Sequence, residues 1–506
     1  MLTLRKIPSY PFYSSYPSYP IYMNLTQRIA RNTIIQFSGK IIGTLLGVLT
    51  IAIMTRYLGQ IGFGQYSTIT AYLQFFAILV DMGLAVTVVR LISDPRYEAQ
   101  KIINNVFSLR FFSALFFLGL APLLIIFFPY DNLIKLGVAI TTLSYFFSAL
   151  NLIIIGLFQK ELKMGGVTVS EIAGRLVLLL LVLLAALANK GLLFIMLAVV
   201  AASAVNFILN YLFALKYVRL AFAFDWGVWK KILALTWPIA VSIAFNLVYF
   251  KADTIILYLF RSQAEVGIYS APYRVLEILT NFIYLFIGLI FPILTLNWTQ
   301  KNFSKFKEIF QKTFDILIII ALPMIFGALF IAKDLMALIA GPEFIASGLV
   351  LQIIIFATAI IFVNSLFGYT VVVIDKQKQM VGAYFLVAII ALAGYLITIP
   401  KYGYIGAAAF TIVSEALIFL FNIIIVIKTT KLGLRLQIIL KTLAASLIMS
   451  VFLFFLQGQN VILRLILASI IYIIALFIFK GLSKELVLAI IGLKSQPNQG
   501  KINGQV

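Results

Sequence analysis

Ionisable side chains inside long apolar runs are the residues of this sequence that could do chemistry. Lys251 and Asp253 lie in one such run, and Arg274 and Glu277 lie in the next, after the polar turn at residues 260–267. An ionised side chain near the centre of a bilayer costs about 2.5–3.5 kcal/mol. Such residues therefore face a bundle interior or a wet cavity, and they mark a path for polar substrates.

The spacing of these four residues decides which of them can share one space. Arg274 and Glu277 are three residues apart and lie on one helix face, whereas Lys251 and Asp253, two apart, point in different directions. At most one of the latter pair can face the space beside Arg274. Two interpretations stay open: structural ion pairs that lock two helices together, or a hydrated, charged cavity that binds substrate.

Three further charged residues lie inside apolar runs. Lys40 is about 9 Å and Asp81 about 13 Å from the same membrane surface, counted at about 1.5 Å per residue. They could therefore meet, either as a structural salt bridge or as an inner counterpart of the central cluster. Glu415 is a lone carboxylate near mid-depth, and it is either a proton or cation site or a helix-packing residue that bonds a hydroxyl.

Composition restricts the chemistry of the whole chain. The 506 residues are 63% hydrophobic and 11% charged, as in a protein that crosses a membrane many times. The chain contains no cysteine and no histidine, which removes thiolate chemistry and the commonest metal ligand. We expect no enzyme activity, no metal site and no cofactor. The net charge of +22 is spread in small groups, which argues against nucleic acid as a partner.

The charged residues require helices long enough to span a bilayer, about 20 apolar residues each. We expect an all-α protein with fourteen spans and short loops. The predicted spans are 34–57, 66–91, 106–128, 133–158, 167–187, 192–215, 233–259, 269–296, 314–332, 347–374, 381–399, 405–427, 438–456 and 462–479. Residues 1–23 are rich in Pro, Ser and Tyr and are predicted to be disordered, with Met23 a hypothetical alternative start.

Loop charge predicts the orientation. With the N-terminus in the cytoplasm, 29 of the 39 Lys and Arg residues lie in cytoplasmic segments, seven lie on the opposite side and three lie inside spans. Positive loops favour the cytoplasm. We therefore expect a multi-pass protein of the cell membrane with both termini cytoplasmic.

An internal repeat predicts two lobes. The motif Gly-x-Tyr-Ser occurs at residues 64–67 and again at 267–270, an offset of 203, and 189–191 resembles 401–403 at an offset of 212. Because each copy joins an odd span to an even one, the repeats have the same topology and are related by an axis along the membrane normal. The expected parts are an N-terminal lobe at 24–219, a C-terminal lobe at 220–430, two extra helices at 431–480 and a cytoplasmic tail at 481–506.

Four stretches carry a resemblance to a known family. They are 55–59 with 62–66, 252–256 with 266–271, 340–344 followed by Ala346, and 399–403 with 406–409, Ser414 and Glu415. In this order, on fourteen spans, they resemble the polysaccharide transporter (Wzx-type oligosaccharide flippase) family of the multidrug/oligosaccharidyl-lipid/polysaccharide exporter superfamily. The resemblance covers residues 24–480.

The resemblance implies a two-lobed transporter that moves a polyprenyl-pyrophosphate-linked oligosaccharide to the outer leaflet. Its substrate-binding residues would be Arg274, Lys251, Lys40, Glu277 and Asp253, because a pyrophosphate needs cations in a wet site. Asp81 and Glu415 would couple an ion, Na+ or H+, or form a structural pair. Arg56 falls on an Arg-x-Leu-Gly motif at a span end, and its expected role is orientation or gating. Polysaccharide-assembly machinery is an expected partner.

Three other functions stay open. A drug/cation antiporter of the same superfamily would have a cavity dominated by carboxylates, whereas here cations and carboxylates are mixed. A lipid II flippase is a second neighbour. A membrane glycosyltransferase or polymerase would need a large outer loop or an Asp-x-Asp metal site, and neither occurs in this sequence.

Overall fold

The computed structural model describes residues 25–81, 83–93, 98–161, 163–218 and 220–481, and within these every regular element is helical. The predicted extension at 1–23, Met23 and nearly all of the tail at 481–506 lie outside the described residues. The α-helices are α1 (Leu25–Asp81), α2 (Leu84–Ser93), α3 (Ala99–Leu124), α4 (Asn132–Lys160), α5 (Gly165–Leu187), α6 (Gly191–Ala214), α7 (Trp226–Phe260), α8 (Gln263–Thr299), α9 (Phe303–Ala340), α10 (Ser347–Val373), α11 (Gln377–Thr430), α12 (Gln437–Phe455) and α13 (Val461–Ile478). Two short 3-10 helices cover Ile125–Phe127 and Pro342–Ala346.

Two of the helices cross the membrane twice. α1 breaks at Gly59 (φ 62°) and α11 at Gly403 (φ 55°), a backbone conformation that glycine adopts without steric cost. After the break in α11 the chain turns back on itself, since the rings of Tyr395 and Phe410 lie 5.7 Å apart. In a straight helix these residues would be about 22 Å apart.

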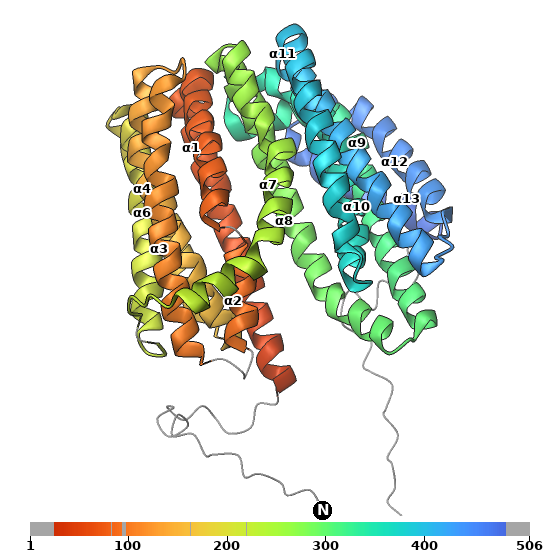
Figure 1. Cartoon of the computed structure of the whole chain (residues 1–506). Helices are drawn as coiled ribbons and strands as arrows, with labels where there is room; N and C mark the ends of the chain where they lie inside the picture. Colours follow the sequence, from red (N-terminus) through yellow and green to blue (C-terminus); the bar gives the residue numbers. More distant parts are fainter. Residues whose placement is uncertain (1–24, 82, 94–97, 162, 219, 482–506) are drawn as a thin grey trace, which may run out of the picture.

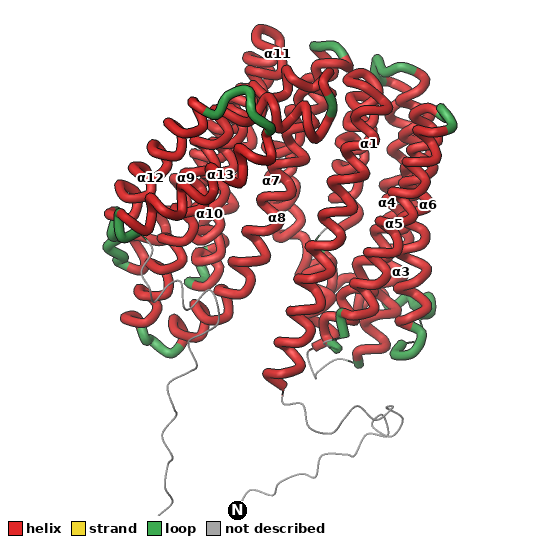
Figure 2. Tube along the Cα trace, turned by 180° about the vertical axis from the view of Figure 1, so that it is seen from behind, coloured by secondary structure: helices red, strands yellow, loops and turns green. Residues whose placement is uncertain are grey.

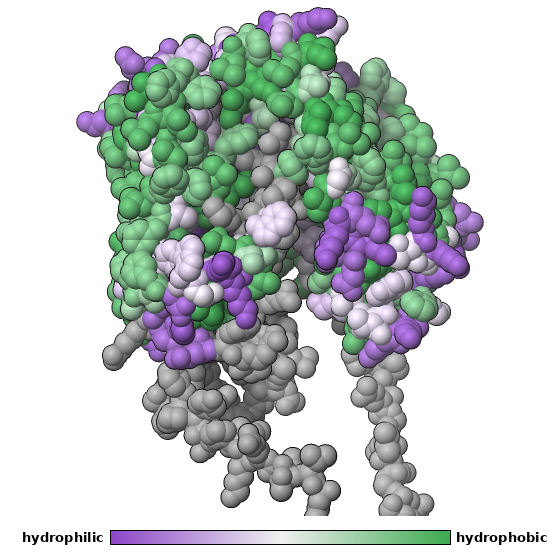
Figure 3. All heavy atoms as spheres, viewed as in Figure 1, coloured by the Kyte–Doolittle hydropathy of each residue, from purple (hydrophilic) through white to green (hydrophobic). Residues whose placement is uncertain are grey.

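The count of membrane crossings confirms the predicted fold class. Eleven described helices are long and apolar enough to span a bilayer. α1 and α11 each supply two crossings, and the 35-residue α7 supplies one more, which gives the predicted fourteen. Apolar side chains form a broad belt around the visible face, and hydrophilic ones gather at its two ends (Figure 3).

The helices form two groups that separate toward the end of the molecule where α1 begins (Figures 1 and 2). One group holds α1 to α6 and the other α8 to α13, with α7 running between them. α12 and α13 pack on α9, where Arg464 of α13 forms an ion pair of 2.5 Å with Asp334. The two extra helices therefore belong to the second group.

A symmetric contact joins the groups at their closed end and confirms the predicted repeat. A Cβ on Gly64 would overlap the carbonyl oxygen of Gln263, and a Cβ on Gly267 would overlap that of Gln60. The two contacts are equivalent in the repeat, because Gly267 follows Gly64, and Gln263 follows Gln60, at the same offset of 203 residues. The backbones of the two lobes therefore lie in close contact at this motif, and only glycine permits that approach. We call this contact the glycine seal.

A second repeated contact lies inside each lobe. The Asn210 side-chain NH2 donates to Asn151 Oδ1 at 2.9 Å in the first lobe, and Asn422 donates to Asn364 at 2.8 Å in the second. The acceptors Asn151 and Asn364 are 213 residues apart, and the donors Asn210 and Asn422 are 212 apart. These separations agree with the offset of 212 found in the sequence between 189–191 and 401–403. These buried amide pairs hold the fourth and sixth helices of each lobe together.

Candidate functional site

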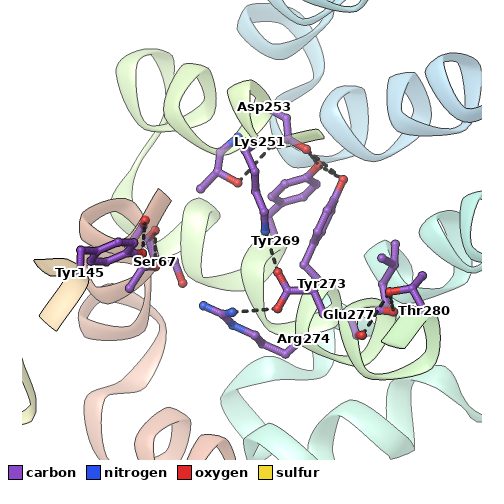
Figure 4. Close-up of polar contacts among 12 residues, drawn as sticks. Ser67, Tyr145, Lys251, Asp253, Tyr269, Tyr273, Arg274, Glu277 and Thr280 are labelled. Atoms are coloured by element: carbon purple, nitrogen blue, oxygen red, sulfur yellow. Dashed lines mark hydrogen bonds and ion pairs between the residues drawn. The ribbon is translucent and has the colours of Figure 1, made fainter. Parts of the chain in front are cut away.

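The central charge cluster joins α7 to α8. Lys251 Nζ lies 2.6 Å from Glu277 Oε1, and Arg274 Nη1 lies 2.8 Å from Glu277 Oε2, so that one carboxylate holds two cations (Figure 4). Between 14% and 26% of each side chain is exposed. The cluster carries a net charge of +1, and all three residues were predicted site residues.

Asp253 points away from this cluster. It is fully buried, and its Oδ2 accepts hydrogen bonds from the Tyr269 hydroxyl at 2.5 Å and the Tyr273 hydroxyl at 2.9 Å (Figure 4). Tyr273 also lies 2.9 Å from the Thr411 hydroxyl of α11. The sequence prediction that only one of Lys251 and Asp253 can face the space beside Arg274 is therefore confirmed. The geometry gives Asp253 a packing role between α7, α8 and α11.

A cavity of about 670 Å³ opens beside the cluster. Arg274, Glu277 and Glu415 line it, and amides, hydroxyls and tyrosines supply most of its remaining polar wall. Those polar residues are Gln74, Thr280, Asn281, Tyr284, Asn364, Ser365, Tyr369, Tyr384 and Asn422. Of the two interpretations of the central charges, the wet, charged cavity therefore fits this geometry, although the ion pairs also connect the helices.

The first lobe contributes the opposite wall. Ser67, Thr70 and Gln74 of α1 line a cleft together with Lys251 and Arg274. The Arg274 guanidinium carbon lies 5.9 Å from the centre of the Tyr66 ring, within the range of a cation–π contact. The charge cluster therefore lies at the boundary of the two lobes, directly below the motif that forms the glycine seal.

Glu415 of α11 lines the same cavity as Arg274, although Arg274 comes 141 residues earlier in the chain. Only 4% of Glu415 is exposed, and it has no hydrogen bond or ion pair with any described residue. The predicted alternative of a helix-packing carboxylate bonded to a hydroxyl therefore does not fit the described structure.

The predicted pairing of Lys40 with Asp81 is wrong. Asp81 forms its ion pair with Arg110, at 2.7 Å, and Lys40 is not among the residues that line the cavity. Arg110 is 1% exposed and also donates to the carbonyl oxygens of Val80 and Asp81, which lie where α1 ends. Because α3 begins at Ala99 rather than at the predicted residue 106, Arg110 lies about 16 Å into the helix.

Arg56 bridges the lobes at the closed end. Its guanidinium donates to the carbonyl oxygens of Leu338 and Ile339, at the end of α9, with an N–O distance of 2.8 Å to Ile339. Gln60 donates to the Glu343 carbonyl oxygen nearby. A cation at the C-terminal end of a helix is electrostatically favourable. The position of Arg56 beside the glycine seal fits the predicted gating role, which stays a prediction.

The sequence analysis missed two buried arginines and the tyrosines around Asp253. Arg110 and Arg464 lie near the starts of predicted spans and were counted with the charges outside the membrane, yet both are at most 2% exposed. The asparagine pairs were also missed, although their offsets of 212 and 213 could have revealed them. Within the described residues no group of three acidic side chains lies close enough to hold a metal ion.

Comparisons with known proteins bear on the fold and the family. Residues 29–298 match the family model of polysaccharide biosynthesis proteins. A protein named as a probable low-salt glycan biosynthesis flippase of Haloferax volcanii is 25% identical over 165 residues, which is 32% of this chain. The match covers 35% of that relative, so the chain spans about a third of its length.

Two solved structures have the same fold. The lipid II flippase MurJ, in an inward closed conformation, superimposes with a TM-score of 0.72 at 14% identity, covering 91% of this chain and 99% of MurJ. An inward-facing multidrug resistance transporter of the MATE family gives 0.64 at 13% identity, covering 79% of this chain and 99% of that one. At these identities the likeness concerns the fold alone.

The two-lobed helical bundle with a charged cavity has the fold of the lipid II flippase MurJ and of a multidrug transporter of the MATE family. The family model covers more than half of the chain. The chain belongs to the polysaccharide biosynthesis protein family, and its named relatives are flippases and transporters.

Proposed function

We propose that the protein flips a polyprenyl-pyrophosphate-linked oligosaccharide from the cytoplasmic to the outer leaflet of the cell membrane by alternating access. The observation that carries this proposal is the position of Arg274 at the wall of a polar cavity, with a second cation, Lys251, in the adjoining cleft between the lobes. The Arg274 side chain donates from Nη1 to Glu277, and a guanidinium group carries five N–H donors in all. Nitrogens of Arg274 thus remain for a phosphate.

The rest of the cavity suits a sugar. Hydroxyl and amide side chains such as Ser365 and Asn281 can exchange hydrogen bonds with sugar hydroxyls, and the rings of Tyr284, Tyr369 and Tyr384 offer flat apolar faces. Its volume of about 670 Å³ is within the range of sites that bind molecules the size of small sugars. The polyprenyl chain would stay in the bilayer, because the lobes separate toward one end of the molecule.

The orientation follows from loop charge: the open end would face the cytoplasm, with both termini there. In the described structure the chain enters and leaves at the same end, as Lys441 of α12 donates to the Lys480 carbonyl oxygen and α1 begins at that end. A lipid-linked sugar made at the cytoplasmic surface would enter this side. Polysaccharide-assembly machinery would then act on the opposite side.

A drug/cation antiporter is the second candidate, and Glu415 favours it, since a carboxylate with no partner among the described residues, in a tyrosine-lined cavity, suits an organic cation. The purified protein in liposomes distinguishes the two. We expect it to move a fluorescent sugar on a polyprenyl pyrophosphate, detected by a membrane-impermeant quencher, and to leave ethidium gradients unchanged. Ethidium transport without lipid movement would contradict the proposed function.

A further inference from the structure

The connection between α6 and α7 lies against α3. Its backbone N–H groups at Ala221, Ala223 and Asp225 donate to side-chain oxygens of α3 at 3.2, 2.8 and 2.8 Å. The acceptors, in that order, are Asn104, Ser108 and Asn105. Backbone N–H groups beside a bilayer need partners of this kind, because lipid tails supply none. These bonds therefore fix the connection to the first lobe.

Large aromatic side chains alternate with the hydrogen-bonded residues of this connection. They are Phe222, Phe224 and Trp226, and 53%, 67% and 68% of their respective surfaces are exposed. Alternate residues of an extended chain point to the same side, and the backbone at Asp225 is extended (φ −107°, ψ 103°). We call Phe222, Phe224 and Trp226 the aromatic ridge. The described part of the chain leaves most of this ridge uncovered.

The aromatic ridge continues the lipid-facing surface of α3. The centre of the Phe112 ring lies 5.5 Å from that of Phe224 and 6.1 Å from that of Phe222. Phe112 is exposed, belongs to a helix long and apolar enough to span a bilayer, and is not among the residues that line the cavity or the cleft. Its exposed side therefore faces lipid. A ridge that adjoins this side meets the bilayer before it meets a soluble protein.

The first turns of α7 run across the bundle beside α2 before the helix turns along it (Figure 1). These turns have one buried and one exposed face. Ile232 and Thr236 are buried, whereas Trp226, Lys230 and Trp237 lie on the opposite face and are exposed. A helix that lies across a bundle and exposes tryptophan and lysine suits the plane of the lipid headgroups.

The exposed charge of this surface is positive. Lys230 and Lys231 follow the aromatic ridge on α7, and both are exposed. Asp225 is the one acidic residue between positions 220 and 237. It pairs with Lys101 of α3 at 2.6 Å and caps the N-terminus of α7. The charge of Asp225 is therefore balanced within the protein, and the lysine charge dominates the surface.

We propose that the aromatic ridge, together with Lys230 and Lys231, docks on anionic phospholipid headgroups. Tryptophan rings anchor at the headgroup level of a bilayer, and lysines beside the bilayer attract anionic lipids. The docked stretch is the chain connection between the two lobes. The lipid would therefore hold the start of α7 with the first lobe while the second lobe moves. This docking is independent of the transported substrate.

Tryptophan fluorescence tests the docking, because three of the four tryptophans of the chain lie between positions 226 and 237. The reporter is the full-length protein with Trp229→Phe, Trp237→Phe and Trp298→Phe, so that Trp226 alone emits. It is placed in phosphatidylcholine nanodiscs that contain, at equal mole fraction, either brominated phosphatidylglycerol or brominated phosphatidylcholine. We expect the anionic lipid to occupy the site beside Trp226 about fivefold more often than the neutral one. No quenching by either lipid, or equal quenching by both, would overturn the proposal.

Lysine variants of the same reporter separate the charge from the rings. Lys230→Gln combined with Lys231→Gln should abolish the preference for anionic lipid, whereas Lys190→Gln, an exposed lysine at the opposite end of α6, should leave it unchanged. The protein with all four tryptophans gives a second reading, in which about 0.5 M salt should weaken the extra quenching by anionic lipid. A preference that persists in the double lysine variant would refute this surface as an anionic lipid site.

Discussion

Replacing Arg274 by alanine should lower transport of the lipid-linked sugar about 10- to 100-fold, because a hydrogen bond to a charged group contributes about 1.5–3 kcal/mol. The substitution removes the guanidinium that lies between Glu277 and the Tyr66 ring, at the boundary of the two lobes. It also leaves Glu277 with Lys251 alone, so that the cluster loses its net positive charge. The measurement is the initial rate of lipid flipping in liposomes.

Two controls separate binding from folding in this experiment. Arg274→Lys keeps the charge but loses the two-pronged geometry of guanidinium, so we expect an intermediate rate. Arg175→Ala removes an arginine of α5 that pairs with Glu171 away from the cavity, and it should retain transport. A rate in Arg274→Ala equal to that of Arg175→Ala, with equal amounts of folded protein, would show that Arg274 does not bind substrate.

Replacing either glycine of the glycine seal by alanine should hold the lobes apart at the closed end. The new Cβ of Gly64→Ala would overlap the carbonyl oxygen of Gln263, and that of Gly267→Ala would overlap the Gln60 carbonyl oxygen. Overpacking of this kind costs about 1–3 kcal/mol. Because this cost falls on the closed arrangement, the ratio of closed to open protein should drop about 5- to 150-fold.

A reporter cysteine makes the opening visible. The chain has no cysteine, so Ser67→Cys, in the cleft below the seal, supplies a single thiol. We expect an impermeant thiol reagent added from the closed side to label it in the Gly64→Ala and Gly267→Ala backgrounds and not in the otherwise unchanged protein. Gly288→Ala on α8 is the matched control, since nothing lies within 4 Å of its new Cβ. Equal labelling in all three glycine variants would contradict the seal.

Hydrophobic length predicted the helical fold well, because each span is a local property of the sequence; the orientation inferred from loop charge stays a prediction. The pairing of Arg274 with Glu277 was predictable for the same reason, since both lie on one helix face. The partner of Asp81 was not predictable, because it depended on where α3 begins and how α1 packs against it. Arg110 lay only four residues inside the predicted span at 106–128 and was counted with the cytoplasmic charges, whereas the observed helix begins seven residues earlier and buries it.

The remaining features of the site needed three-dimensional contacts. Tyr269 and Tyr273 surround Asp253 because α7 and α8 run side by side, and no local pattern relates a lone aspartate to those hydroxyls. Glu415 reaches the Arg274 cavity across 141 residues of sequence. The internal repeat was the one long-range signal in the sequence, and it predicted the glycine seal's two motifs but not that they touch.

The central claim is that water fills the space beside the buried charges, and thiol accessibility tests it most directly. Asn281→Cys places a thiol on the cavity wall of α8, and Leu289→Cys places one on an exposed apolar position of the same helix, about 12 Å away. We expect an impermeant thiol reagent applied from the open end to label Asn281→Cys and not Leu289→Cys. Failure to label Asn281→Cys, or equal labelling at both positions, would contradict a water-filled passage between the lobes.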